Sequence, residues 1–117
     1  MDPWYGLGGA DMLDVAHMAV HAAPMTSREA IAWSFAAVTE APARVMGLEG
    51  YGLHVGANAD FVLLQAADPI EAVRLRAERL AVVRRGRVIA RTPERTTALA
   101  LEGRPATVDP ADYVPRG

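Results

Sequence analysis

The sequence contains no cysteine and no lysine, so all 12 of its basic residues are arginine. Without cysteine the chain can form no disulfide, no thiolate nucleophile and no cysteine-ligated zinc site. It has no run of 18 apolar residues, and its N-terminus carries neither the basic nor the apolar region of a signal peptide. We therefore expect a cytoplasmic protein that does not associate with membranes.

The core-forming residues are also few. The chain has 117 residues, 51% of them hydrophobic, but 23 of the hydrophobic residues are alanine and only 27 are Leu, Ile, Val or Phe. This length is typical of one domain, and the apolar content lies just above the range in which disorder is expected. We expect a thin core and surfaces that pack against something else.

Charge is divided unevenly along the chain. Residues 1–60 hold seven acidic residues against two arginines, a net charge of −5, whereas residues 74–95 hold eight arginines against two glutamates, a net charge of +6. The arginine-rich stretch has few aromatic residues for base stacking, so a solvated or subunit-facing strand surface is favoured over nucleic-acid binding.

The first half of the sequence predicts helices. Asp11 can cap a helix over residues 12–23 that ends before Pro24, and a second helix over residues 27–46 begins at Thr26 or Ser27. Pro42 should kink or divide the second helix.

The second half predicts strands. The apolar run within residues 60–65 indicates a buried strand, and Asp68-Pro69 has the form of a helix start. A short helix near residues 69–76 and a hairpin over residues 80–91 follow, with Arg85-Gly86 at the turn. Residues 96–101 are a further candidate strand. The pattern of helices first and strands second predicts an α+β fold.

Three groups of residues could carry chemistry. His17 and His21 lie four apart on a helix, where two side chains can share a metal, but no third ligand is evident and a structural role is favoured. His54 lies in a glycine-rich stretch and is interpreted as a surface residue. Trp4 and Tyr5 occupy a glycine-rich loop, and either pack against the protein or line a ligand site.

Several segments resemble a known family. The segments are Asp-Pro-Trp-Tyr-Gly-Leu-Gly over residues 2–8, the helix sequence of residues 11–21, the Gly-Leu-His-Val-Gly-Ala-Asn-Ala-Asp segment of residues 52–60, and the hairpin of residues 82–90. Together they resemble the C-terminal portion of a cytosine deaminase-like member of the amidohydrolase superfamily.

The resemblance implies an organisation and a function. Residues 1–49 would be a loop and helices at the end of a (β/α)8 barrel, residues 50–101 part of a small β-sandwich, and residues 102–117 an extended tail. The family's activity is hydrolytic deamination of cytosine or a related aminopyrimidine, with release of ammonia, and an intact enzyme would use iron or zinc. The family's metal ligands have no counterpart here, and Asp2 does not match one of them.

The resemblance assigns roles to few residues of this chain. Trp4 matches a position beside the substrate pocket, whereas His17 and His21 match positions that bind no metal. Asp60 matches a turn residue that we expect to cap backbone amides. We therefore expect no catalytic residue, no metal ligand and no turnover from the chain alone. The alternative function is a non-enzymatic module that associates with itself or with another protein.

Overall fold

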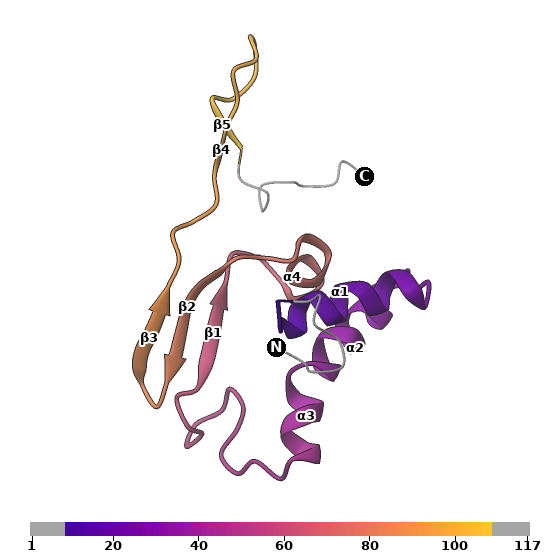
Figure 1. Ribbon diagram of the computed structural model, residues 1–117, viewed down its shortest axis with the longest axis vertical. Helices are drawn as coiled ribbons and strands as arrows, with labels where there is room; N and C mark the ends of the chain where they lie inside the picture. Colours follow the sequence, from indigo (N-terminus) through magenta and orange to yellow (C-terminus); the bar gives the residue numbers. More distant parts are fainter. Residues whose placement is uncertain (1–8, 109–117) are drawn as a thin grey trace.

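The computed structural model describes residues 9–108, which form a layer of helices beside an antiparallel sheet, with a hairpin standing apart from both (Figure 1). The elements in chain order are α1 (Met12–Ala22), α2 (Arg28–Ala37), α3 (Glu40–Val45), β1 (Phe61–Leu64), α4 (Pro69–Leu75), β2 (Arg79–Arg84), β3 (Arg87–Arg91), β4 (Thr97–Ala98) and β5 (Thr107–Val108). This mixture of helices and strands agrees with the predicted α+β class.

Side-chain caps fix the starts of three helices. The Asp11 carboxylate accepts the Leu13 N–H at 2.8 Å at α1, and the Asp68 carboxylate accepts the Glu71 N–H at 2.8 Å at α4. At α2 the cap is Ser27, whose hydroxyl accepts the Ala30 N–H at 3.1 Å. Such caps satisfy amide groups that lack partners within the helix, and each contributes about 1 kcal/mol.

The single helix predicted over residues 27–46 is divided, but ahead of the proline. α2 ends at Ala37, and α3 begins at Glu40, so that Pro42 lies in the first turn of α3. A proline ring clashes with the carbonyl of the residue four positions earlier, which here is Val38, and it has no N–H to donate. The chain therefore breaks around Val38 and resumes as a helix in which Pro42 is tolerated.

The sheet has the strand order β1-β2-β3, with both neighbouring pairs antiparallel. The β2–β3 turn places Arg85 and Gly86 at φ 47° and 72°, the positive angles of a type I′ hairpin turn. Asp60 accepts the Arg85 N–H, so the prediction that this residue caps backbone amides is confirmed. Asp60 thereby ties the start of β1 to the β2–β3 turn.

The prediction that β1 is buried is wrong. Its residues Phe61, Val62 and Leu63 are 37%, 44% and 53% exposed. The apolar run forms a strand, but within residues 9–108 that strand has β2 on one side only, because it lies at the edge of the sheet. An uninterrupted apolar sequence indicates that a strand can be covered on both faces, and not that the chain itself supplies the cover.

The core lies between the helices and is small, as the composition predicts. Leu13 and Ala16 of α1 pack against Val73 of α4, which is the only large side chain with no exposed surface in the described part of the chain. Polar groups hold the same helices together, since the buried Ser34 hydroxyl donates to the Ala16 carbonyl at 3.0 Å. This helical part of the core joins α1, α2 and α4, and Ala81 and Val83 of β2 are buried as well.

Residues 97–108 form a hairpin, whose first strand lies in the candidate strand of residues 96–101 and whose second strand lies in the segment expected to be an extended tail. Thr97 pairs with Val108 and Ala98 with Thr107, and the Arg104 N–H donates to the Leu101 carbonyl at 3.2 Å across the turn. Gly103 has a φ of 74°, which this turn requires and which glycine adopts without strain. We call residues 92–108, which project from the body in Figure 1, the arm. Residues of the expected tail beyond 108 lie outside the described residues.

Candidate functional site

An open groove with a volume of about 590 Å³ lies between the helices and the sheet. We call it the interlayer groove. Its helical wall is lined by Met12, Leu13, Phe35, Val38, Thr39 and Glu40, and its strand wall by Asp60, Phe61, Val62, Leu64, Arg79, Val82, Val83, Arg84 and Ile89, with Tyr51, Gly52 and Leu53 closing one end. The lining is mainly apolar, so the groove is suited to apolar side chains.

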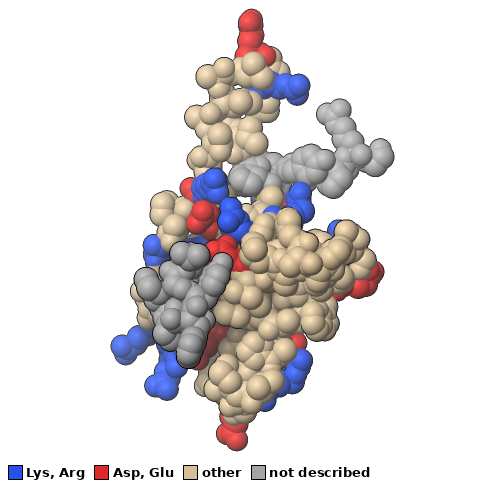
Figure 2. Space-filling view, turned by 45° about the vertical axis from the view of Figure 1, so that its right-hand side comes forward, with Lys and Arg blue, Asp and Glu red and all other residues tan. Residues whose placement is uncertain are grey.

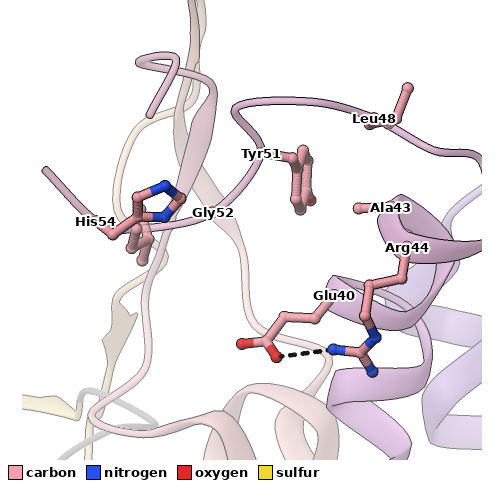
Figure 3. Close-up of a pocket in the computed structure, with 8 residues that line it drawn as sticks. Glu40, Ala43, Arg44, Leu48, Tyr51, Gly52 and His54 are labelled. Carbon is pink, nitrogen blue, oxygen red and sulfur yellow. Dashed lines mark ion pairs between the residues drawn. The ribbon is translucent and has the colours of Figure 1, made fainter. Parts of the chain in front are cut away.

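A smaller pocket of about 340 Å³ adjoins this closed end. Tyr51 and His54 reach it from the loop, and Glu40 and Arg44 reach it from α3, where they form an ion pair at 3.7 Å (Figure 3). Both members of the pair are about 70% exposed. Exposed pairs of this kind contribute little energy, so the pocket offers polar groups but no desolvated centre for chemistry.

An ion pair beside the interlayer groove joins the helical layer to the sheet. Both Nη atoms of Arg79 on β2 donate to the two carboxylate oxygens of Asp11 at the start of α1. The Arg79 hydrogen bonds hold the pKa of Asp11 below its usual value, and the same contact raises the pKa of Arg79. Asp11 therefore has two roles, since it caps α1 and also joins the helical layer to the sheet.

The two histidines of α1 lie side by side, with ring centroids 4.4 Å apart, and each ring contacts a backbone carbonyl. Nδ1 of His17 lies 3.0 Å from the Val73 carbonyl oxygen, and Nδ1 of His21 lies 3.0 Å from the His17 carbonyl oxygen. The first contact joins α1 to α4, which is a structural role. Residues 9–108 contain no group of three His, Asp or Glu side chains arranged to hold a metal, so they do not fit a catalytic metal ion.

The other residues singled out from the sequence are dispersed. His54 is exposed and lies at the small pocket, not beside His17 or His21. The residues of β3 are exposed, in agreement with a solvated arginine-rich strand surface. Trp4 and Tyr5 lie outside the described residues. Neither the interlayer groove nor the arm was predicted, because both depend on which apolar residues the tertiary structure leaves uncovered.

None of the helices in residues 9–108 has the length and hydropathy needed to cross a bilayer. The mixed surface of Figure 2 carries acidic and basic residues close together on the strand side, and a broad area without charged residues over the helices. Exposed apolar residues of α1 and α2 contribute to the helical surface: Met12, Val15, Met18 and Trp33.

Comparison with known proteins places this arrangement in context. A family model described as "Amidohydrolase family" matches residues 1–90. The chain is 33% identical, over 89 residues, to N-isopropylammelide isopropyl amidohydrolase of Pseudomonas sp. (strain ADP). Among solved structures it resembles 5-methylcytosine deaminase from Klebsiella pneumoniae at 33% identity with a TM-score of 0.73. It also resembles N-isopropylammelide isopropylaminohydrolase from Burkholderia multivorans at 37% identity with a TM-score of 0.71.

The coverage of these matches is unequal. They extend over 75% to 80% of this chain, but over only 22% or 23% of the related proteins. The chain thus spans less than a quarter of the length of the relatives it matches. The arm lies beyond the part of the chain that the family model matches, since that match ends at residue 90, within β3.

Proposed function

Because this chain belongs to the amidohydrolase family and is similar to a 5-methylcytosine deaminase, we propose that it forms the C-terminal portion of a cytosine deaminase-like hydrolase. The reaction of such an enzyme replaces the amino group of a pyrimidine-like ring with oxygen from water and releases ammonia. In this proposal the chain supplies scaffold and one wall of the substrate pocket, and the reacting groups come from polypeptide equivalent to the rest of the relatives' length.

The similarity to the Klebsiella enzyme carries the proposal. A TM-score of 0.73 at 33% identity, over 80% of this chain, means that helices and strands follow one another in space much as they do in that deaminase. Residues 9–108 bring together no three ligands for a catalytic metal. An iron or zinc ion, which we propose for the whole enzyme, would then be held by residues outside this segment.

At finer detail, we assign α1 to α3 to the end of a (β/α)8 barrel and the three-stranded sheet to part of a small β-sandwich. The exposed apolar residues support this assignment, because Val15 and Met18 of α1 and Leu63 of β1 are each more than half exposed in the isolated chain. Exposed apolar side chains on both layers support contact with further polypeptide. The thin core has the same explanation.

The first test is a deaminase assay on the purified 117-residue chain, with cytosine as substrate and iron or zinc added. We expect no release of ammonia above the rate without protein, because proton transfer and water activation need groups held within hydrogen-bond reach of the substrate. Ammonia release at enzyme-like rates, about 1 to 1,000 per second, would overturn the proposal that this chain lacks a catalytic centre.

Trp4 is the residue for which we propose contact with the substrate. It falls within the matched range of residues 1–90 and belongs to the segment that resembles cytosine deaminases. The test uses a chimera in which residues 1–90 replace the equivalent segment of the Klebsiella deaminase. In an active chimera Trp4→Ala should raise KM, whereas the matched control Trp33→Ala, on α2, should leave KM unchanged. Equal effects of the two substitutions would contradict the assignment.

A second candidate function is self-association without catalysis. The observation that favours it is the combination of an uncovered apolar groove with an arm that projects from the body.

A further inference from the structure

The two histidines of α1 lie together on the side of the helix that meets α4. Side chains four positions apart on a helix are neighbours on one face, and His17 and His21 have this spacing. Their imidazole rings are inclined by 42° to each other, with centroids 4.4 Å apart. His17 is half-buried and His21 is exposed, so solvent reaches the pair at its outer member. The pair is therefore accessible to small ions.

The contacts of each ring determine which of its nitrogens can bind a metal. Nδ1 of His17 lies 3.0 Å from the Val73 carbonyl oxygen, and Nδ1 of His21 lies 3.0 Å from the His17 carbonyl oxygen. A carbonyl oxygen can only accept a hydrogen bond, so in both rings Nδ1 carries the proton. In the neutral ring the lone pair then belongs to Nε2. Metal-binding histidines have this arrangement, in which a backbone carbonyl orients the ring and makes its other nitrogen a stronger ligand.

The separation of the rings fits one shared ion. Metal–nitrogen bonds to histidine are about 2.1 Å long, so two imidazoles bound at about a right angle have ring centres about 4.5 Å apart. The observed separation of 4.4 Å is close to this value. The helix backbone therefore need not move for both Nε2 atoms to reach the same ion.

The position of the pair along the helix also favours a cation. His21 lies in the last turn of α1, which ends at Ala22. Carbonyl groups at the C-terminal end of a helix lack partners within it, and they give that end a partial negative charge. A positive ion held by His21 is stabilised by this charge.

We propose that His17 and His21 form a binding site for a divalent ion of zinc, nickel or copper, held by the two Nε2 atoms. Imidazole is a preferred ligand of these metals. Residues 9–108 contain no group of three potential protein ligands, so water completes the coordination. The ion bridges consecutive turns of α1 and stabilises the end of this helix. The contact of His17 with Val73 uses Nδ1 alone, so metal binding leaves that contact in place.

This inference goes beyond the proposed enzymatic function and does not depend on it. It rests on residues of α1 and α4 in this chain, and its tests measure metal binding and unfolding. Failure of the deaminase proposal would leave the site standing. A chain that binds no metal at this pair would leave the assignment to a deaminase-like hydrolase intact.

The first experiment is calorimetric titration of the whole chain with Zn²⁺, Ni²⁺ and Cu²⁺. We expect each ion to bind at the pair, with Cu²⁺ bound more tightly than Ni²⁺ or Zn²⁺. His21→Ala should weaken binding by at least about tenfold, because a second ligand on the same helix acts at high effective concentration. This variant is preferred to His17→Ala, since the His17 ring also joins α1 to Val73.

The matched control for His21→Ala is His54→Ala. It removes an exposed histidine that lines the small pocket, and it should leave metal binding unchanged. Absence of binding to the unmodified chain, or equal losses from the two substitutions, would overturn the proposal.

A second control keeps the number of histidines and changes only their spacing. Combining His21→Ala with Ala22→His retains three histidines but places one of them five positions after His17, on another side of α1. Ala22 is exposed, so the new side chain has room. This double variant should bind metal as weakly as His21→Ala. Binding as tight as that of the unmodified chain would show that the pair is not the site.

Two further readouts identify the ligands and the effect on stability. Pulsed electron paramagnetic resonance of the chain with one equivalent of Cu²⁺ should show two bound imidazoles, and at most one in His21→Ala. Zn²⁺ should raise the midpoint of thermal unfolding of the unmodified chain, because an ion that binds the folded state more tightly stabilises it, and should raise that of His21→Ala less. A signal from a single imidazole in the unmodified chain, or equal midpoint shifts in the two proteins, would contradict the proposal.

Discussion

The ion pair between Asp11 and Arg79 gives the sharpest prediction about what holds the two layers together. Asp11 accepts the Leu13 N–H as the cap of α1 and binds both Nη atoms of Arg79 on β2. The cap contributes about 1 kcal/mol. The pair is partly exposed, with 25% of the Asp11 side chain and 37% of the Arg79 side chain accessible, so we assign it about 1 kcal/mol, the upper end for surface pairs, because its geometry is bidentate.

Three variants separate these contributions. Asp11→Ala removes the cap and the pair and should lower the free energy of unfolding by about 2 kcal/mol. Asp11→Asn keeps a good capping residue and loses the charge, so it should cost about 1 kcal/mol. Arg79→Met keeps an apolar stem on β2 and should also cost about 1 kcal/mol. Urea denaturation followed by circular dichroism gives all three values.

The double variant completes the test. If the pair accounts for the effect of Arg79→Met, the combination of Asp11→Ala with Arg79→Met should cost about 1 kcal/mol less than the sum of the single costs. A coupling below about 0.3 kcal/mol, within the error of additivity, would refute the argument that this pair joins the layers.

The same pair makes stability depend on pH. Because the pKa of Asp11 is lower in the folded chain than in the unfolded one, its contribution is complete above the unfolded value of about 3.9 and is lost as pH falls through the lowered folded value. Between pH 5 and pH 2 the unmodified chain should therefore lose more stability than Asp11→Asn, which has no charge to lose. Parallel losses in the two proteins would contradict this assignment.

Three further substitutions and one control test the fold. Val73→Ala, at the one large side chain with no exposed surface in the described chain, should cost about 2 kcal/mol in urea denaturation, whereas Val88→Ala, 45% exposed on β3, should cost less than about 0.5 kcal/mol. Gly86→Ala should lower the free energy of unfolding by about 1 kcal/mol, because alanine is strained at the φ of 72° that Gly86 adopts. The new methyl group would lie 4.0 Å from Ala59 without a clash, so backbone strain accounts for the cost. A neutral result would show that the turn relaxes. Ser34→Ala should cost about 1 kcal/mol by removing the hydrogen bond to Ala16, and no change in the melting curve would show that this bond adds nothing.

Local signals in the sequence predict much of this fold. Asp11 and Asp68 begin helices where capping chemistry places them, and Arg85-Gly86 makes the turn of a hairpin. These features depend on a few neighbouring residues, so no knowledge of distant contacts is needed. The break near Val38 was displaced from Pro42 for a reason that is also local, the clash of a proline ring with the carbonyl four residues earlier.

Burial could not be predicted in the same way. The β1 sequence is apolar throughout, which is typical of a strand covered on both faces, yet Val62 and Leu63 are about half exposed in the described chain. The pairing within the arm could not be predicted either. The two residues of β4 pair with β5 because the chain turns at Gly103, and the sequence of β4 alone does not indicate this turn. A sequence pattern indicates which kind of surface a segment can pack against. Whether that surface is present depends on the tertiary structure.

The sequence likewise predicts only part of the candidate site. The resemblance identified the family through segments such as residues 52–60, and the family match and the similar structures confirm it. The structural role of His17 follows from a contact with Val73, 56 positions away in the sequence, which spacing alone does not reveal. The interlayer groove was missed for this reason too, since its two walls come from distant halves of the chain.

We propose that this chain serves as the C-terminal portion of a cytosine deaminase-like hydrolase. The most direct measurement is ammonia release from 5-methylcytosine by the chimera in which residues 1–90 replace the equivalent segment of the Klebsiella enzyme. The replaced segment is less than a quarter of that enzyme. We expect a folded chimera that deaminates the substrate while the isolated chain does not. A chimera that folds cooperatively and binds metal, but releases no ammonia, would contradict the claim.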